Sequence, residues 1–112
     1  MGYQTYFSLR MEGPEDKIQE VLDSRFSNKR IEWLVKKEEY EGSWYDFEKD
    51  FAIFAKDFPD VLFIVHGDGE ESDDIWEQRF KGTKNERHYA EILPFTYLLT
   101  ERETKQKQLN ID

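Results

Sequence analysis

Apolar and polar residues alternate along residues 3–12, at the start of the chain. This period of two predicts a strand with one face buried and the other in water. The residues that would share the buried face are Tyr3, Thr5, Phe7, Leu9 and Met11. Pro14 and the two acidic residues after it favour the start of a helix, because carboxylates interact well with the positive end of the helix dipole. The apolar stripe of this helix runs from Ile18 to Phe26, so we expect it to end near Ser27.

A second helical pattern lies in the middle of the chain. Its apolar residues recur at spacings of three and four, the period of one helix face. They are Phe47, Phe51, Phe54, Ala55 and Phe58. Ser43 has the position of an N-cap, with Asp46 three residues later as in a capping box. Pro59 would stop the helix at its other end.

The remaining strands are predicted from shorter patterns. Within residues 30–41, Ile31, Trp33 and Val35 alternate with polar or less regular positions, which indicates a short strand. The sequence VLFIV, residues 61–65, is apolar on both faces, which is typical of a strand in the centre of a sheet. Two more strands are predicted over residues 75–80 and 87–93, on either side of the turn sequence KGTKN.

These elements predict an α+β fold, a two-layer sandwich in which a mainly antiparallel sheet of about five strands carries two helices on one face. The expected order is strand, helix, strand, helix and then three strands in an antiparallel meander. The chain has 112 residues, which favours a single α+β domain over residues 1–95. Residues 96–112 are polar, and we expect a tail or a frayed helix there.

Composition limits the classes of function. The net charge of −9 disfavours direct binding to nucleic acid, which depends on Lys and Arg, and favours partners with a basic surface. The chain has no cysteine, which excludes disulfides and thiol chemistry and fits a reducing cytoplasm. Apolar runs such as residues 61–65 are far too short to span a membrane. The N-terminal residues lack a signal-peptide pattern, so we expect a cytoplasmic protein without membrane contacts.

The densest cluster of carboxylates lies in HGDGEESDDIW, residues 66–76, directly after the predicted central strand. The carboxylates of this acidic turn are Asp68, Glu70, Glu71, Asp73 and Asp74. A calcium loop would need glutamate at its twelfth position, which is Arg79 when counted from Asp68. His66 and His88 lack the spacing of a helical zinc pair. No nucleophile elbow and no Gly-rich phosphate loop accompany the acids. The sequence therefore predicts no metal, no cofactor and no catalytic residue, with a metal-dependent or acid–base enzyme as the alternative.

We interpret the acidic turn as a recognition surface, because carboxylates on a rigid turn can take the place of DNA phosphates on a basic protein. The predicted binding residues are Asp68, Glu70, Glu71, Asp73, Asp74 and Trp76, with the tryptophan as the anchor. A solvated turn whose charges discourage edge pairing is the simpler alternative. Trp44 and Tyr45 form a secondary candidate patch. They would either cover the core or form the face of a homodimer, which would make the protein a self-associating structural protein.

Residues 42–85 combine a W-Y-D helix start, the sequence F-P-D-V-L-F, a G-x-G-E-E turn and a D-I-W strand. This combination resembles a pattern in small, mostly uncharacterised acidic α+β proteins of bacteria, phages and mobile elements. The chain departs from that pattern in its looser KGTKN turn and its long polar tail. The resemblance implies a ferredoxin-like sandwich and brings no activity and no catalytic residues. Its context implies a protein that binds and blocks a host defence or regulatory protein, such as a CRISPR nuclease, by occlusion.

Overall fold

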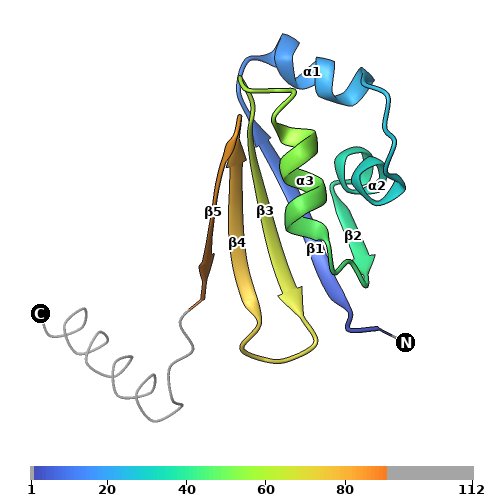
Figure 1. Ribbon diagram of the computed structural model, residues 1–112, viewed down its shortest axis with the longest axis vertical. Helices are drawn as coiled ribbons and strands as arrows, with labels where there is room; N and C mark the ends of the chain where they lie inside the picture. The colour runs from blue at the N-terminus through green and yellow to red at the C-terminus, as the bar shows by residue number, and fades with distance from the viewer. Residues whose placement is uncertain (1, 91–112) are drawn as a thin grey trace, which may run out of the picture.

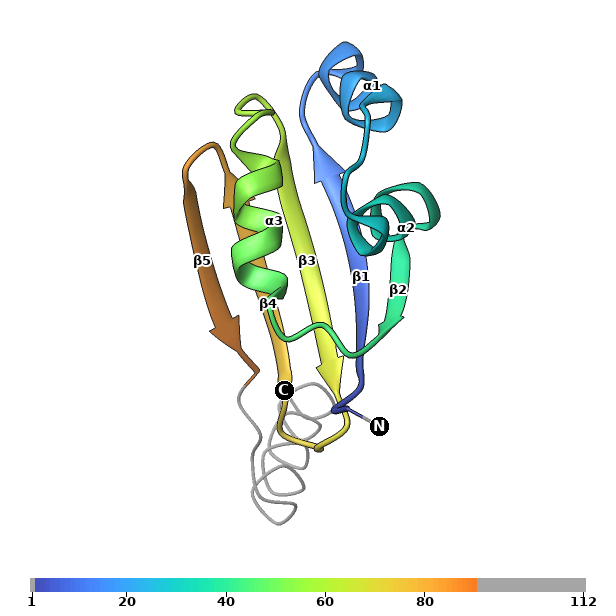
Figure 2. The same ribbon diagram turned by 45° about the vertical axis from the view of Figure 1, so that its right-hand side comes forward.

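The computed structural model describes residues 2–90, which form one five-stranded sheet with three helices packed on one face (Figures 1 and 2). The strands are β1 (Thr5–Glu12), β2 (Glu39–Gly42), β3 (Leu62–Gly69), β4 (Ile75–Lys81) and β5 (Lys84–Tyr89). The helices are α1 (Glu15–Asp23), α2 (Lys29–Lys37) and α3 (Phe47–Ala55). None of these helices is long and apolar enough to cross a membrane.

The strands lie in the order β2-β1-β3-β4-β5, and every neighbouring pair is antiparallel. The predicted two-layer α+β sandwich is therefore confirmed, with β3 in the centre and β3-β4-β5 as the meander. The chain order is β-α-α-β-α-β-β-β, which has one helix more than predicted. It also differs from the β-α-β-β-α-β order of a ferredoxin-like domain.

Helix α2 occupies most of the segment that the alternation predicted as a strand. Asn28 caps this helix, because its side-chain oxygen accepts the backbone N–H of Ile31 at 3.3 Å. The buried residues are Ile31, Leu34 and Val35, at helical spacing, whereas Trp33 is 55% exposed. The strand prediction for residues 30–41 was wrong over this stretch because it grouped Trp33 with the buried residues and left out Leu34.

Two other boundaries differ from the prediction. Helix α1 ends at Asp23 rather than near Ser27, because the Ser24 hydroxyl donates to the Val21 carbonyl oxygen at 2.7 Å and closes the last turn. Helix α3 begins at Phe47, later than the N-cap predicted at Ser43. Proteins use serine hydroxyls at several kinds of turn besides helix caps, so the capping-box pattern alone was insufficient.

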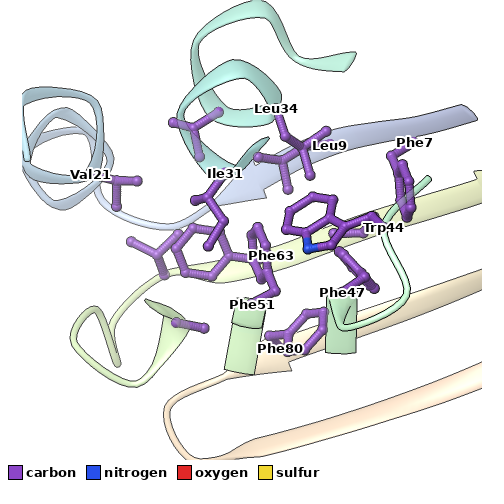
Figure 3. Packing of buried hydrophobic residues seen from close by; sticks show 14 of the residues in the cluster. Phe7, Leu9, Val21, Ile31, Leu34, Trp44, Phe47, Phe51, Phe63 and Phe80 are labelled. Carbon is purple, nitrogen blue, oxygen red and sulfur yellow. The ribbon is translucent and has the colours of Figure 1, made fainter. Parts of the chain in front are cut away.

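The core is an aromatic cluster between α3 and the sheet (Figure 3). Phe51 is fully buried, and its ring centroid lies 5.4 Å from that of Phe63 and 4.9 Å from that of Phe80. One turn earlier, the Phe47 ring lies 5.0 Å from Phe7 on β1. The rings are mostly tilted or edge-on to one another, which is the favourable arrangement for aromatic pairs. The predicted apolar face of α3 is thus the contact that joins the two layers.

The hairpin between β4 and β5 confirms the turn predicted at KGTKN. Lys81 pairs with Lys84, so only Gly82 and Thr83 form the loop. Gly82 has a φ of 60°, which suits the first position of a type II′ turn, where glycine is favoured. The last strand therefore starts at Lys84 rather than at residue 87. Residues 91–93 of the predicted strand and the predicted tail over residues 96–112 lie outside the described residues.

Replacement of Phe51 by alanine should lower the free energy of unfolding by about 3–5 kcal/mol, because it opens a cavity in the aromatic cluster. Ile53 on the same helix is 54% exposed, so Ile53→Ala should change stability by only about 0.5 kcal/mol. Urea denaturation of both variants measures the difference. Equal losses in the two variants would contradict this placement of α3.

Candidate functional site

The acidic turn connects β3 and β4 at the end of the sheet where the N-terminal segment also lies (Figure 1, yellow). Asp68 is exposed on β3, and Glu70, Glu71 and Asp73 are exposed in the turn itself. Asp74 is half-buried. The structure therefore keeps all five predicted carboxylates at one place and leaves four of them open to solvent.

Tyr3 holds the acidic turn in one conformation. Its hydroxyl donates to Asp74 Oδ2 at 2.8 Å and accepts the backbone N–H of Glu71 at 3.0 Å. Two backbone hydrogen bonds close the turn, from Gly69 N–H to Asp74 O at 2.8 Å and from Asp74 N–H to Glu71 O at 3.0 Å. We call this arrangement of Tyr3, Gly69, Glu71 and Asp74 the Tyr3 clasp. The sequence gives no local signal for it, because Tyr3 and Asp74 are 71 positions apart.

The backbone of Tyr3 is bound in turn to the segment that precedes α3. The Tyr45 hydroxyl accepts the Tyr3 N–H at 2.7 Å, and the Ser43 hydroxyl donates to the Tyr3 carbonyl oxygen at 2.8 Å. This bond is what Ser43 makes in place of the predicted helix cap. The consequence is that the N-terminal end of α3, with Asp46, lies at the same end of the sheet as the acidic turn (Figures 1 and 2).

Trp76, predicted as the anchor of the binding surface, is a core residue with 4% exposure. It lies opposite Gly67 in the β3–β4 pair. A Cβ atom on Gly67 would lie 2.1 Å from the Trp76 indole, so the missing side chain makes the space for the ring. The Arg87 guanidinium lies 3.8 Å from the centroid of the same ring. The assignment of Trp76 to an exposed contact therefore needs correction.

The secondary patch is also divided between core and surface. Trp44 is buried, and its indole N–H donates to Asp50 Oδ2 at 2.9 Å. The Asn28 amide donates to the same carboxylate oxygen at 3.2 Å, which joins the start of α2 to α3. Tyr45, next in sequence, is 76% exposed. Trp44 thus covers the core, which was one of the two alternatives for this patch. Only Tyr45 of the pair presents its aromatic ring to solvent.

Sequence reasoning missed the buried polar residue Gln78, which lies on the helix-covered face of β4 with no exposed surface. Its amide nitrogen donates to Glu48 Oε2 at 3.0 Å and to Asn85 Oδ1 at 2.9 Å, and its oxygen accepts from Arg87 Nε at 2.8 Å. Every polar atom of this side chain is therefore satisfied, as burial requires. No local pattern in the sequence indicated the partners of this side chain.

The charges of the acidic turn are not neutralised by any cation within residues 2–90. The four Lys and Arg ion pairs of this part of the chain and the contact between His88 and Glu86 lie elsewhere, on helices and on the open face of the sheet. In the same residues, no three His, Asp or Glu side chains are grouped in a way that could hold a metal ion. The acidic turn thus presents negative charge to solvent, and its carboxylates are not grouped as ligands for a metal ion.

Comparison with known protein families, with curated proteins and with solved structures gave no match for this chain.

The environment of Tyr3 raises the pKa of its hydroxyl. The largest single influence, the hydrogen bond from the Glu71 N–H, would lower the pKa. Desolvation, the hydrogen bond to Asp74 and the negative charges of Asp74 and Glu71 together outweigh it. The neutral phenol is thus the form that the Tyr3 clasp stabilises.

Alkaline pH should open the Tyr3 clasp. Because the pKa of Tyr3 is higher in the folded protein than in the unfolded chain, its stabilisation is complete below the unfolded value of about 10 and is lost as pH rises through the folded value. The stability difference between the wild type and Tyr3→Phe should therefore be constant at neutral pH and shrink above a pH of about 10. Urea denaturation of both proteins over this range measures it. A difference that stays constant into strong alkali would contradict the clasp.

Proposed function

We propose that the protein binds a basic surface of another protein through the acidic turn and acts by steric and electrostatic occlusion, without chemistry of its own. The observation that carries this proposal is the Tyr3 clasp, which fixes the backbone that bears exposed Glu70, Glu71 and Asp73. A loop held in one conformation before binding loses less conformational entropy on binding.

The class of partner that fits is a protein that handles nucleic acid, because such a protein displays Lys and Arg where phosphates bind. The acidic turn would occupy that surface in place of phosphates. Asp46, at the start of α3, adds an exposed carboxylate at the same end of the sheet. A host defence protein, the partner class implied by the resemblance, belongs to this group, and the encounter would take place in the host cytoplasm.

The burial of Trp76 changes how such a complex would be held together. Without an aromatic anchor, the contact depends on exposed charges, which mainly speed association and set specificity. These charges are also screened by salt, since the screening length falls from about 30 Å at 0.01 M to about 3 Å at 1 M ionic strength. We therefore expect a fast and strongly salt-dependent interaction.

Neutralisation of the acidic turn should abolish partner binding. In the variant Glu70→Gln/Glu71→Gln/Asp73→Asn, the fold should persist because these side chains are exposed and Tyr3 bonds only to the backbone of Glu71. The matched control is E20Q/D57N/D60N, which removes the same number of charges from exposed positions. These positions lie on α1 and between α3 and β3, at the other end of the sheet (Figure 1). The measurement is capture of proteins from nuclease-treated bacterial lysate, with added double-stranded DNA as competitor.

We expect the wild type and the control to capture a nucleic-acid-handling protein that added DNA displaces. The acidic-turn variant should capture none. Retention by the acidic-turn variant would overturn the assignment of this site. Capture that survives high salt unchanged would overturn the electrostatic mechanism.

A further inference from the structure

A second surface lies at the β2 edge of the sheet. Two large aromatic side chains are exposed there. Trp33 is 55% exposed and Tyr6 is 40% exposed. They line a hollow of about 590 Å³, which we call the β2-edge hollow. Its complete lining is Tyr6, Trp33, Lys37, Glu39, Tyr40 and Glu41. The rings of Tyr6 and Trp33, two carboxylates and one lysine thus line this surface, whereas the Tyr40 ring packs against Phe7 and Trp44 in the core.

The strand register explains why these residues meet. Glu41 pairs with Tyr6, and Glu39 pairs with Ser8, so both glutamates and Tyr6 project from the sheet face opposite to the aromatic core. Trp33 comes from α2, which precedes β2 by a single residue in the left-handed conformation, Glu38 with a φ of 66°. That tight connection brings the exposed ring of the helix to the edge of the sheet.

The hollow is negatively charged, because two glutamates and only one lysine line it. The Tyr6 hydroxyl donates to Glu39 Oε1 at 2.5 Å, which leaves the other carboxylate oxygen free to accept. Neither Glu39 nor Glu41 forms an ion pair with a cation of residues 2–90. Lys37 Nζ lies 5.9 Å from the centroid of the Trp33 ring, at the outer limit of a cation–π contact. A positively charged group already approaches this ring from within the chain.

The backbone of β2 adds a second recognition element. Within residues 2–90 this strand pairs only with β1, so it forms one edge of the sheet. An extended segment of another protein can add to such an edge through main-chain hydrogen bonds, while pockets beside the edge select its side chains. Charged side chains on an edge strand discourage pairing with most segments. Glu39 and Glu41 therefore restrict the added segment to one that carries a positive charge.

We propose that the β2-edge hollow binds an arginine side chain from an extended segment of a partner protein, and that this segment pairs with β2. Arginine fits better than lysine because its planar guanidinium can stack on an aromatic ring and donate two parallel hydrogen bonds to a carboxylate. The inference is independent of the proposed function, since it uses none of the residues of the acidic turn.

The test is a titration of the full chain with the blocked peptide Thr-Val-Arg-Val-Thr and with the same peptide carrying citrulline, which has the shape of arginine without its charge. The readout is the NMR signal of each tryptophan indole N–H. The Trp33 signal should shift and saturate with a Kd below about 1 mM for the arginine peptide only. The signals of Trp44 and Trp76, both buried, should stay in place and show that the fold is intact.

Two variants make the site assignment falsifiable. Glu39→Gln/Glu41→Gln should weaken binding at least tenfold, whereas Glu70→Gln/Glu71→Gln, which removes the same charge from the acidic turn, should leave it within twofold. Equal binding of the citrulline peptide, an unmoved Trp33 signal or equal losses in the two variants would overturn the proposal. A Trp33 signal that shifts on dilution without peptide would assign the hollow to a second copy of the chain and would also overturn it.

Discussion

The contact of Phe47 and Phe51 with the sheet is the interaction on which the rest of the structure depends. These two residues lie one turn apart on α3, and their rings reach β1, β3 and β4. Because α3 lies over the middle of the sheet, its N-terminal end is set at the end of the sheet that carries the acidic turn. A packed interior tolerates little change in volume, so the position of Tyr45 relative to Tyr3 follows from this packing.

The absence of a side chain at Gly67 determines that Trp76 is buried and not part of the surface. The missing Cβ lets the Trp76 ring lie across β3, where Arg87 covers its other face. Gln78, two residues further along β4, is held by a complete set of hydrogen bonds. The fully satisfied polar network fixes β5 against β4 and α3, because an incomplete one would be costly in the interior. Trp76, which the sequence analysis assigned to the binding surface, is therefore part of the core.

The two candidate surfaces use negative charge in different ways. At the acidic turn, carboxylates stand in water on a backbone that Tyr3 immobilises, which suits long-range steering and a salt-sensitive contact. At the β2-edge hollow, Glu39 and Glu41 lie beside aromatic rings and an unpaired strand edge, which suits short-range selection of one side chain. At each surface a tyrosine hydroxyl donates a hydrogen bond to a carboxylate. Tyr3 donates to Asp74 at the acidic turn, and Tyr6 donates to Glu39 at the β2-edge hollow.

The sequence by itself determined the elements whose pattern is local and regular. The alternation of residues 3–12, the aromatic spacing of α3, the apolar run of β3 and the glycine turn at Gly82 each predicted the element that forms, because burial of one face imposes the period of the backbone. Only the tertiary structure decided α2, the burial of Trp76 and the Tyr3 clasp. Whether Trp33 or Leu34 faces the core depends on which element packs there. The space for Trp76 comes from a glycine on the neighbouring strand. Tyr3 and Asp74 meet only because β1 pairs with β3, and contacts between residues so distant in the chain leave no periodic signal in the sequence.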